Sequence, residues 1–574
     1  MNYVVGLEPI TLEQMKDLYY VPGLLAKIIK GEHLPKIPLF SANDLFPLAE
    51  YQPLQPNQKT LTVKLINRGG GIGHVQLIIN DKECGGDARP PNFDPNRTSA
   101  TLEIDLEKCG LLVPGRQNRI EVVARNASGS LNSRGSSRGV EIVGLFDKDA
   151  KAPPPHLYAI IGGVSNYTGD NMDLDYAAKD AEDFAKVLEL GASRLFGPDK
   201  VHIRLLTSNG NKSTVKFRAA DAKIFTATKA DFQRAFDELK NATSSDIFVV
   251  YLAGHGVSLN INQSNLQPGG NLYLYLTQEA TTTDTSVLGD ENVRRAMSIS
   301  SDELAELIKQ NKTLKQVLIL DTCAAGAAGP ILSVRRDLPS DQLKAIDRLQ
   351  SRIGFFVLMG SAADRVSYET SQYGQGLLTY SLLLGLRGEK LRDDRFADVS
   401  ELFTYAQDKV PTLAKNIGGI QRPIVMSPER ERAVLFGENG SFDIGMFTDV
   451  EWKAFPPSPT PKPFVLRPML IDVKENYDDL ELTPLLRQAL RVGSEAPSDL
   501  IGATALAFVN ADEMQDAVKI SGLYKVEGDT VSVTIRLTRN KLPLGKALTV
   551  IGKLGEKDQL VKRIVGAIMR ADFK

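Results

Sequence analysis

Cysteine and histidine are scarce in this sequence. Its 574 residues include three cysteines, Cys84, Cys109 and Cys323, and five histidines. Three cysteines are too few for a disulfide framework, and such a low count is typical of a reducing compartment. We therefore expect Cys84 and Cys109 to be reduced and the protein to be cytoplasmic. Because so few residues of either type are present, the place of each one in the fold is informative.

Long apolar runs and an excess of charge of one sign are also missing. No run approaches the roughly 20 apolar residues that a helix needs to cross a bilayer. Residues 1–10 lack the basic segment that opens a signal peptide, so we expect none. The formal net charge is -2, which gives no electrostatic reason to expect a nucleic-acid or membrane partner. With 42% hydrophobic and 24% charged residues, the composition is that of a globular protein with substantial cores.

Two proline-rich segments divide the chain. Residues 147–156 contain three consecutive prolines, and residues 455–463 read FPPSPTPKP, a composition typical of linkers. At roughly 100–200 residues per domain, the length fits three or four units. The predicted units are a partly helical N-terminal extension (1–54), an all-β sandwich of immunoglobulin-like type (55–146), a central α/β domain (157–436) and a small α+β accessory domain (464–574).

Hydrophobic periodicity gives each unit its class. In the second unit, apolar and polar residues alternate as in half-buried strands. In the third, continuous apolar strands alternate with amphipathic helices, which predicts a mostly parallel sheet covered by helices on both faces. Thr228 is the expected N-cap of one of these helices. The expected strands are 158–161, 201–206, 247–252, 317–320 and 355–359, and the helices 176–190, 230–239, 302–308 and 377–386. In the last unit we expect a hairpin of 519–525 with 531–537, and helices at 482–490 and 560–569.

Two apolar strands of the central unit run directly into a reactive side chain. The first leads into AGHG at 253–256, and the second into DTCA at 321–324. Sites in open α/β sheets lie beyond the carboxyl ends of the strands, so His255 and Cys323 would meet there if the strands are neighbours. An imidazole beside a thiol raises the thiolate fraction and can protonate a leaving amine. We therefore predict Cys323 as nucleophile and His255 as general base and acid, with the N–H groups of Gly256 and Cys323 as the oxyanion hole.

Each of these residues also has an ordinary structural explanation. A cysteine after a buried strand is usually a small core residue, and a histidine before a glycine is often a loop residue. The pairing is stronger than either residue alone, because each is the only one of its type at a carboxyl strand end of this unit.

Several further motifs accompany the pair, and together they resemble the caspase superfamily, in particular its metacaspase and bacterial caspase-like (orthocaspase-type) branch. The resemblance spans residues 157 to about 428 and implies a caspase-like α/β fold and a cysteine endopeptidase. One departure is the absence of the caspase pentapeptide Q-A-C-[RQG]-G; Asp321 stands two residues before Cys323 instead. The matching motifs are the opening strand (158–162), the first helix (175–181), the histidine motif (253–256), the nucleophile motif (321–326) and the later half (360–362, 367–369, 376–380).

That departure implies a specificity. Other caspases bind an acidic P1 residue through basic side chains, whereas the metacaspase-like branch binds a P1 arginine or lysine through acidic ones. Asp180 and Asp321 match its acidic positions, and we place Ala253 in the same P1 pocket. Two carboxylates suit a guanidinium by charge and by bidentate geometry, so we predict cleavage after Arg and, more weakly, after Lys. Taken alone, Asp180 could equally be a solvated carboxylate on a helix.

The segment after the cysteine suggests self-processing. Residues 329–352 are polar, and in this superfamily the corresponding linker is often cleaved. Arg335 and Arg336 are therefore candidate autocleavage sites, although a plain surface loop explains them as well. We predict no metal site and no cofactor. Calcium activation, known in metacaspases, cannot be read from the acidic pairs at 290–291 and 393–394, since such pairs usually lie on a solvated surface.

The expected partners are a protein or peptide substrate and a regulatory protein bound through one of the flanking units. Two other functions stay open. The first is a catalytically silent scaffold that keeps the caspase fold for binding, which the presence of both His255 and Cys323 disfavours. The second is a different α/β hydrolase that uses a thiol, which leaves Asp180 and Asp321 unexplained.

Overall fold

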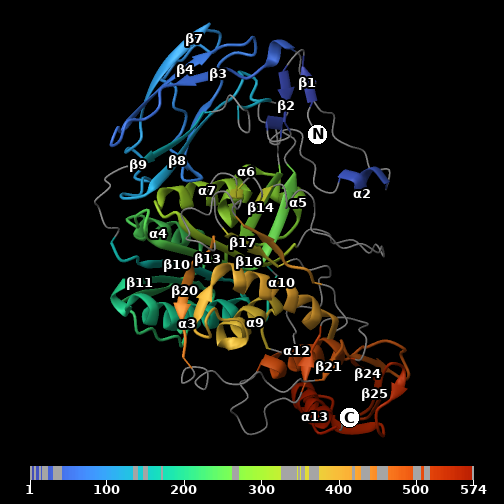
Figure 1. The fold of residues 1–574 in the computed structure, drawn as a ribbon. Helices are drawn as coiled ribbons and strands as arrows, with labels where there is room; N and C mark the ends of the chain where they lie inside the picture. Colours follow the sequence, from blue (N-terminus) through green and yellow to red (C-terminus); the bar gives the residue numbers. More distant parts are fainter. Residues whose placement is uncertain are drawn as a thin grey trace.

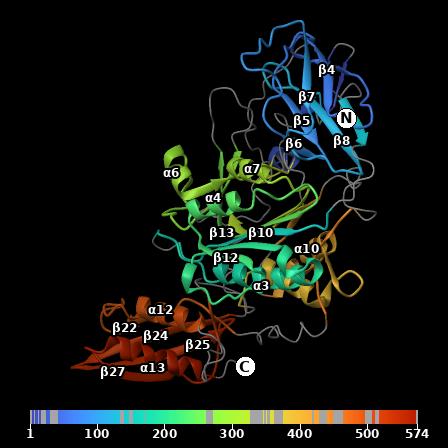
Figure 2. The same cartoon turned by 90° about the vertical axis from the view of Figure 1, so that its left-hand side faces the viewer.

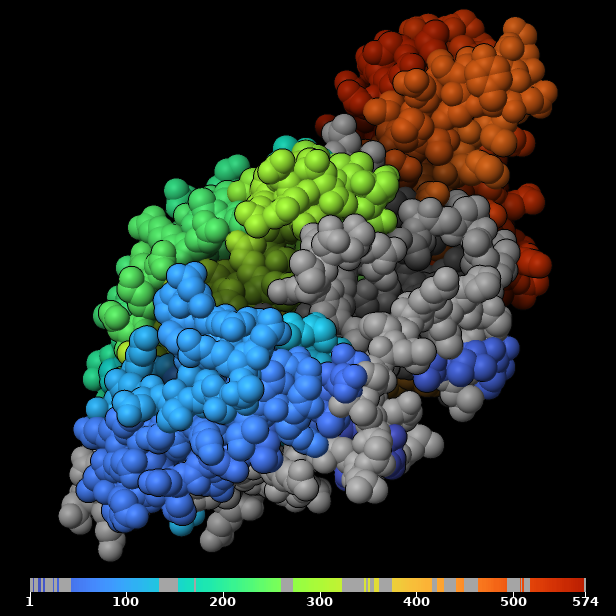
Figure 3. Space-filling view, turned by 90° about the horizontal axis from the view of Figure 1, so that it is seen from above, coloured from blue at the N-terminus to red at the C-terminus, as the bar shows by residue number. Residues whose placement is uncertain are grey.

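The structure is a computed structural model that runs from a strand-rich N-terminal unit through a central α/β domain to a C-terminal α+β unit (Figure 1). The two flanking units lie at opposite ends of the central domain, and the space-filling view from above also separates them (Figure 3). The described residues are 3–5, 8–11, 14–15, 24–29, 42–133, 140–145, 153–169, 172–260, 271–324, 345–346, 349–350, 356–360, 374–416, 421–427, 440–448, 463–495, 506–509 and 517–571.

A mostly parallel sheet forms the centre of the molecule, as predicted. Its main strand order is β12-β11-β10-β13-β16-β17-β19. All neighbours in this order are parallel except β19, which pairs antiparallel with β17. The strands are β10 (Leu157–Gly163), β11 (Val201–Thr207), β12 (Asp221–Thr226), β13 (Ile247–Asn260), β16 (Lys315–Ala324), β17 (Phe356–Met359) and β19 (Ile424–Met426).

Helices cover both faces of this sheet, which explains the continuous apolar runs in its central strands. Val249 faces the core shared with α3, α9 and α10, whereas the next residue, Val250, faces the core shared with α4 and α7. Figure 2 shows the two helical layers, with α4 and α7 on one side of the sheet and α3 on the other. Thr228 caps α4, as expected, because its side chain accepts a hydrogen bond from the N–H of Asp231. The helices are α3 (Ala177–Phe196), α4 (Lys229–Glu238), α7 (Ser301–Gln310), α9 (Leu377–Leu384) and α10 (Val399–Asn416).

Strand β13 is much longer than the predicted 247–252. It continues past His255 because β14 (Asn271–Leu276) pairs with its second half in antiparallel fashion, and β15 (Ser298–Ser300) pairs with β14 in turn. The glycines and polar residues after 252 resemble a loop in sequence, and only the tertiary partner reveals the strand. Two further short strands, β18 (Phe396–Asp398) and β20 (Asp443–Met446), pair with each other beside α3.

The N-terminal unit packs two antiparallel sheets around one apolar core that includes Leu61, Leu77 and Ile120. Its all-β character agrees with the sequence, and its first sandwich strand lies inside the predicted extension. The immunoglobulin-like type stays a prediction. The sheets are β3 (Leu48–Tyr51), β4 (Thr60–Ile66) and β7 (Ser99–Asp105), and β6 (Lys82–Cys84), β5 (Val75–Ile79), β8 (Gln117–Ala124) and β9 (Val140–Leu145); before them lie β1 (Tyr3–Val5), β2 (Glu8–Ile10) and α2 (Leu24–Ile29).

The expectation that Cys84 and Cys109 are reduced is wrong, because the structure joins them in a disulfide. Their Cα atoms are 5.5 Å apart, within the usual range for a disulfide. Cys84, at the end of β6, is buried in the core of the sandwich, and Cys109, in the turn after β7, packs against that core. The number of cysteines in a sequence carries no information on such proximity.

The sandwich is anchored to the central domain through Lys82, whose side chain is only 1% exposed. Its Nζ donates to the carbonyl oxygens of Ile308 (3.4 Å), Thr313 (3.3 Å) and Asn311, at the C-terminal end of α7. A helix C-terminus presents carbonyl groups without intrahelical partners, so a buried amine is a suitable cap there. The two units therefore share a specific, buried polar contact.

In the C-terminal unit, α12 and α13 cover one face of a sheet, with Leu486, Val533 and Ile564 in the shared core. The predicted hairpin is confirmed by the antiparallel pair β24–β25. No helix within the described ranges is long and apolar enough to cross a membrane. The elements are β21 (Phe464–Val465), β22 (Met469–Asp472), α12 (Leu482–Glu495), β23 (Ala507–Phe508), β24 (Val518–Glu527), β25 (Thr530–Arg539), β26 (Leu542–Pro543), β27 (Leu548–Lys553) and α13 (Lys557–Met569).

Candidate active site

His255 and Cys323 occupy aligned positions on the neighbouring parallel strands β13 and β16. Neighbouring strands lie roughly 4.8 Å apart, and aligned residues of a parallel pair project to the same face of the sheet. The sequence placed the two residues at strand ends that would meet, and the structure brings their backbones side by side. The thiol of Cys323 lies outside the described part of the molecule.

The hydrogen bond of His255 determines which ring nitrogen is basic. Its Nε2 lies 2.7 Å from the carbonyl oxygen of Met172. A carbonyl oxygen can only accept, so Nε2 carries the proton and Nδ1 of the neutral ring keeps its lone pair. Nδ1 is buried and has no hydrogen-bond partner among the described residues. The imidazole is therefore oriented with its basic nitrogen free.

The surroundings of His255 favour the neutral ring. Burial lowers the pKa of His255, and this effect outweighs the Met172 carbonyl and the Asp173 carboxylate, which both raise it. Tyr167 adds a second restraint. Its Oη accepts a 2.8 Å hydrogen bond from the backbone N–H of His255, and its ring packs on the imidazole with a centroid distance of 4.9 Å. A neutral, oriented imidazole is the state that a general base requires.

Met172 and Tyr167 are functional neighbours that the sequence did not indicate. Both come from the segment between β10 and α3. Met172 acts through its backbone carbonyl, which any residue type supplies, so no sequence signal marks it. Tyr167 is recognisable only once the fold places it against His255.

Asp180 and Asp321 come together from α3 and β16 at the N-terminus of α9. Asp180 is 3% exposed, so a solvated position is excluded. Its Oδ2 accepts a 2.9 Å hydrogen bond from the N–H of Gly376. Oδ2 of Asp321 accepts from the N–H of Thr379 at 3.2 Å and also from its hydroxyl. Tyr251 Oη lies 2.5 Å from the same hydroxyl oxygen, which fixes Thr379 in place.

Gly376 keeps the space between the two carboxylates open. A Cβ at this position would lie 2.8 Å from Oδ2 of Asp180 and 3.1 Å from Oδ2 of Asp321. The first distance is a clash and the second is very tight. In the sequence, residues 376–380 indicate only the resemblance to the caspase superfamily. Nothing in that motif marks Gly376 or Thr379 as residues of the P1 pocket.

The charge of Asp321 raises the affinity of Asp180 for protons. Burial and then the charge of Asp321 raise the pKa of Asp180, and burial raises the pKa of Asp321 against the hydrogen bonds from Thr379. Oδ1 of Asp180 has no hydrogen-bond partner in the described ranges. Nor does any described lysine or arginine form an ion pair with Asp180 or Asp321. Within the described ranges the pair is thus an acidic centre without an ion-pair partner, and the charge of Lys179 only partly offsets the repulsion at Asp180.

The other predicted site residues are placed as follows. Ala253 is aligned with Asp321 in the sheet and is buried, so it lies beside the carboxylate pair. Gly256 has aligned neighbours on both sides, Tyr275 and Ala324, and an oxyanion role for its N–H stays a prediction. Arg335 and Arg336 lie outside the described residues.

The acidic pairs considered for calcium have local roles. Asp290 caps α6 (Glu291–Met297) through the N–H groups of Asn292 and Val293. Asp393 forms a 2.8 Å ion pair with Arg392. Among the described residues, no three His, Cys, Asp or Glu side chains are grouped so that they could hold a metal ion.

Comparison with known proteins agrees with this geometry. The family model described as the caspase domain matches residues 156–434. No curated protein sequence matches the chain. Among solved structures, pro-sf-caspase-1 is similar with a TM-score of 0.24 and 11% identity, covering 48% of this chain and 94% of that chain. A polysaccharide deacetylase from Bacillus cereus has a TM-score of 0.13 and 9% identity, with coverage of 48% and 70%. At such TM-scores these structures add nothing to the family match, by which the central domain of this chain belongs to the caspase superfamily.

Proposed function

We propose that the central domain is a cysteine endopeptidase that cleaves peptide bonds after arginine and, more slowly, after lysine. The observation that carries the proposal is the alignment of His255 with Cys323, next to the acidic centre formed by Asp180 and Asp321. The caspase family supplies a cysteine peptidase at the coarser level. The basic P1 preference is the feature of the metacaspase-like branch, and this chain's carboxylates support it.

The chemistry follows from the tautomer of His255. The Cys323 thiol gives its proton to Nδ1, and the thiolate sulfur attacks the scissile carbonyl carbon. The imidazolium, held by the Met172 carbonyl through Nε2–H, then donates the proton to the leaving amine as the C–N bond breaks. Water completes the cycle: His255 removes one of its protons, the oxygen attacks the thioester, and the thiol is released. Backbone N–H groups near Gly256 and Cys323 would bind the oxyanion.

The specificity follows from the uncompensated carboxylates. A P1 guanidinium would provide the cation that Asp180 and Asp321 lack and would relieve their mutual repulsion. Its planar fork can bond to two oxygens at once, which an ammonium cannot do in the same geometry. An acidic P1 side chain would add a third negative charge to a buried site, which is strongly unfavourable.

The test compares fluorogenic peptides that differ only at P1, with Arg, Lys or Asp. We expect kcat/KM to fall in that order with the wild-type protein and to be abolished in Cys323→Ala. Faster cleavage after Asp than after Arg would overturn the specificity. If no peptide is cleaved and an Arg-directed electrophile never labels Cys323, the domain is instead a silent caspase-fold scaffold.

A further inference from the structure

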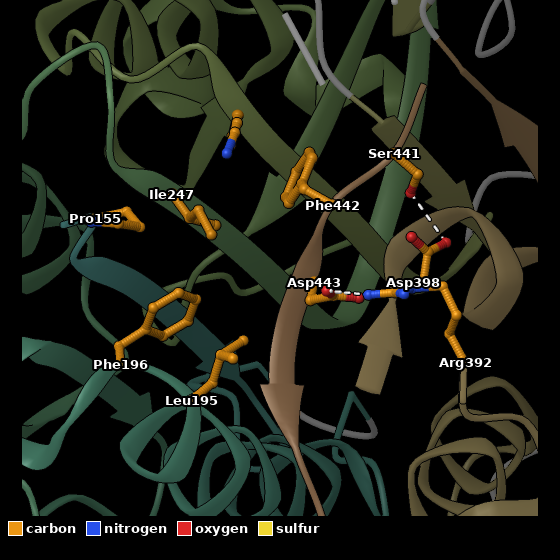
Figure 4. Close-up of a pocket in the computed structure, with 10 residues that line it drawn as sticks. Pro155, Leu195, Phe196, Ile247, Arg392, Asp398, Ser441, Phe442 and Asp443 are labelled. Carbon is orange, nitrogen blue, oxygen red and sulfur yellow. Dashed lines mark hydrogen bonds and ion pairs between the residues drawn. The ribbon is translucent and has the colours of Figure 1, made fainter. Parts of the chain in front are cut away.

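A cavity lies at the opposite end of the central sheet from His255 and Cys323. Its volume is about 380 Å³, and its lining includes Ile247 and Lys315, the first residues of β13 and β16. Ile247 is labelled in Figure 4. Cys323 lies eight positions after Lys315 along β16, which at about 3.3 Å per residue corresponds to roughly 26 Å. The cavity is therefore distinct from the candidate active site.

One wall of the cavity is apolar. Leu195 and Phe196 come from the last turn of α3, Phe442 from the residue before β20, and Ile247 from the start of β13. Their labelled side chains turn toward the same space in Figure 4. This wall can receive a hydrocarbon or aromatic group of moderate size.

The acidic groups in the lining are already engaged. Asp443 forms a 2.6 Å ion pair with Arg392. Asp398 accepts hydrogen bonds of 3.0 Å from both the Ser441 hydroxyl and the N–H of Glu401. Burial also raises the pKa of Asp398, against the hydrogen bonds from Glu401 and Ser441. These two carboxylates therefore oppose an anion less than their formal charge suggests.

Lys315 is the charged side chain of the cavity lining that has no ion-pair partner among the described residues. Its side chain lines the cavity and is partly buried, and it makes no hydrogen bond or ion pair with any described residue. Burial and the positive charge of Arg116 lower the pKa of Lys315, and the charge of Asp443 only partly offsets them. A bound anion would satisfy the ammonium and remove this penalty.

We propose that the cavity is a binding site for a small carboxylate with a compact apolar body. The carboxylate pairs with the ammonium of Lys315, and the apolar body packs against Phe196, Ile247 and Phe442. This ligand would be neither a peptide substrate nor a participant in the proteolytic reaction. The binding site does not depend on the proposed P1 specificity.

The test is calorimetric titration of the full chain with phenylacetate as the probe. We expect saturable binding to one site. Phenylacetamide, which has the same body without the charge, and acetate, which has the charge without the body, should each bind about tenfold or more weakly, the equivalent of one ion pair or one apolar contact. Equal binding of phenylacetate and its amide, or no saturable binding at millimolar concentrations, would overturn the proposal.

Two variants locate the site. Lys315→Met keeps the length of the side chain and should weaken phenylacetate binding about tenfold, whereas Lys240→Met, which removes an exposed charge outside the cavity, should not change it. Leu195→Trp leaves Lys315 in place but fills the cavity from α3 and should also abolish binding. If Lys315→Met does not fold, the Leu195→Trp variant tests on its own whether phenylacetate binds in this cavity. Unchanged binding in a folded Lys315→Met or Leu195→Trp protein would sink the assignment.

Discussion

The backbone N–H of Gly376 donates a 2.9 Å hydrogen bond to Asp180, and the absence of a side chain at Gly376 leaves room between Asp180 and Asp321. A methyl group there would lie 2.8 Å and 3.1 Å from their Oδ2 atoms. We expect Gly376→Ala to raise KM for an Arg-P1 peptide about tenfold or more, because the space for the guanidinium is lost. Steady-state kinetics with peptides that differ only at P1 measure this.

A matched control is Gly86→Ala in the sandwich, where an added Cβ meets nothing within 4 Å. It should leave both kinetics and thermal stability unchanged. If Gly376→Ala binds Arg-P1 peptides as tightly as wild type while remaining folded, the space beside the carboxylates is not the P1 pocket.

Asp180 itself provides a test in which activity and stability change in opposite directions. Burial and Asp321 raise the pKa of Asp180, so the charged carboxylate is penalised in the folded state at neutral pH. We expect Asp180→Asn to lower kcat/KM for Arg peptides by about a hundredfold or more through loss of the ionic contact. The same change should leave the melting temperature at pH 7.5 equal or higher, because an amide is neutral.

The control for this pair of effects is Asp237→Asn on the exposed face of α4, where neither quantity should change. A marked loss of stability in Asp180→Asn at pH 7.5 would contradict a penalised charge. It would mean instead that the carboxylate stabilises the fold.

The pH dependence of kcat should report His255. Burial lowers the pKa of His255, so the ring stays neutral and basic to a pH below the ordinary imidazole value of about 6.5. With saturating Arg-P1 peptide, the midpoint of the acid limb in the pH profile of kcat should therefore lie below pH 6.5. An acid limb above pH 6.5 would show that the ring is stabilised in its protonated form. Tyr167→Phe, which removes the acceptor of the His255 N–H, should lower kcat without abolishing it.

Much of this site was predictable because it depends on strand ends. Apolar strands before His255 and Cys323 are visible in the sequence, and parallel strands deliver such residues to one edge of the sheet. Asp180 and Asp321 were placed through the resemblance to metacaspases, and their burial against Gly376 is new. The carbonyl of Met172 could not be predicted, since a backbone oxygen has no sequence signal.

The sequence also failed where tertiary partners override local patterns. β14 extends β13 through a stretch of glycines and polar residues, and Cys84 meets Cys109 across the sandwich. Lys82 shows the same limit, because lysine is usually exposed and its burial depends on carbonyl groups more than 220 positions further along the chain.

Self-processing at Arg335 or Arg336 is a separate prediction of the proposed specificity. If the domain cleaves after arginine, purified wild type should yield two fragments on a denaturing gel, and Cys323→Ala should stay intact. The double variant Arg335→Gln/Arg336→Gln should also stay intact while it still cleaves Arg-P1 peptides. Fragments in the Cys323→Ala protein would indicate another protease, and an intact wild-type chain would rule out processing at these residues.

Lys82 should make the stability of the protein depend on pH. Burial, with a contribution from Lys309, lowers the pKa of Lys82 to about 7, whereas an unfolded lysine titrates near 10.4. Between these values the unfolded chain binds more protons than the folded one, so the free energy of unfolding rises with pH. The full penalty for the buried charge applies below pH 7, where the three carbonyl groups around Nζ only partly offset it.

Urea unfolding at pH 6.0 and pH 8.5 measures this effect. We expect the wild-type midpoint to be higher at pH 8.5, and the difference to shrink in Lys82→Met, which has no ionisable group at the junction. Lys312→Met is a suitable comparison, because Lys312 is exposed on the same segment of the central domain and should keep the wild-type pH dependence. The opposite result would be a urea midpoint that decreases from pH 6.0 to pH 8.5 in the wild type but not in Lys82→Met. In that case the carbonyl groups at the end of α7 stabilise the ammonium more than burial penalises it, and a charged lysine holds the sandwich.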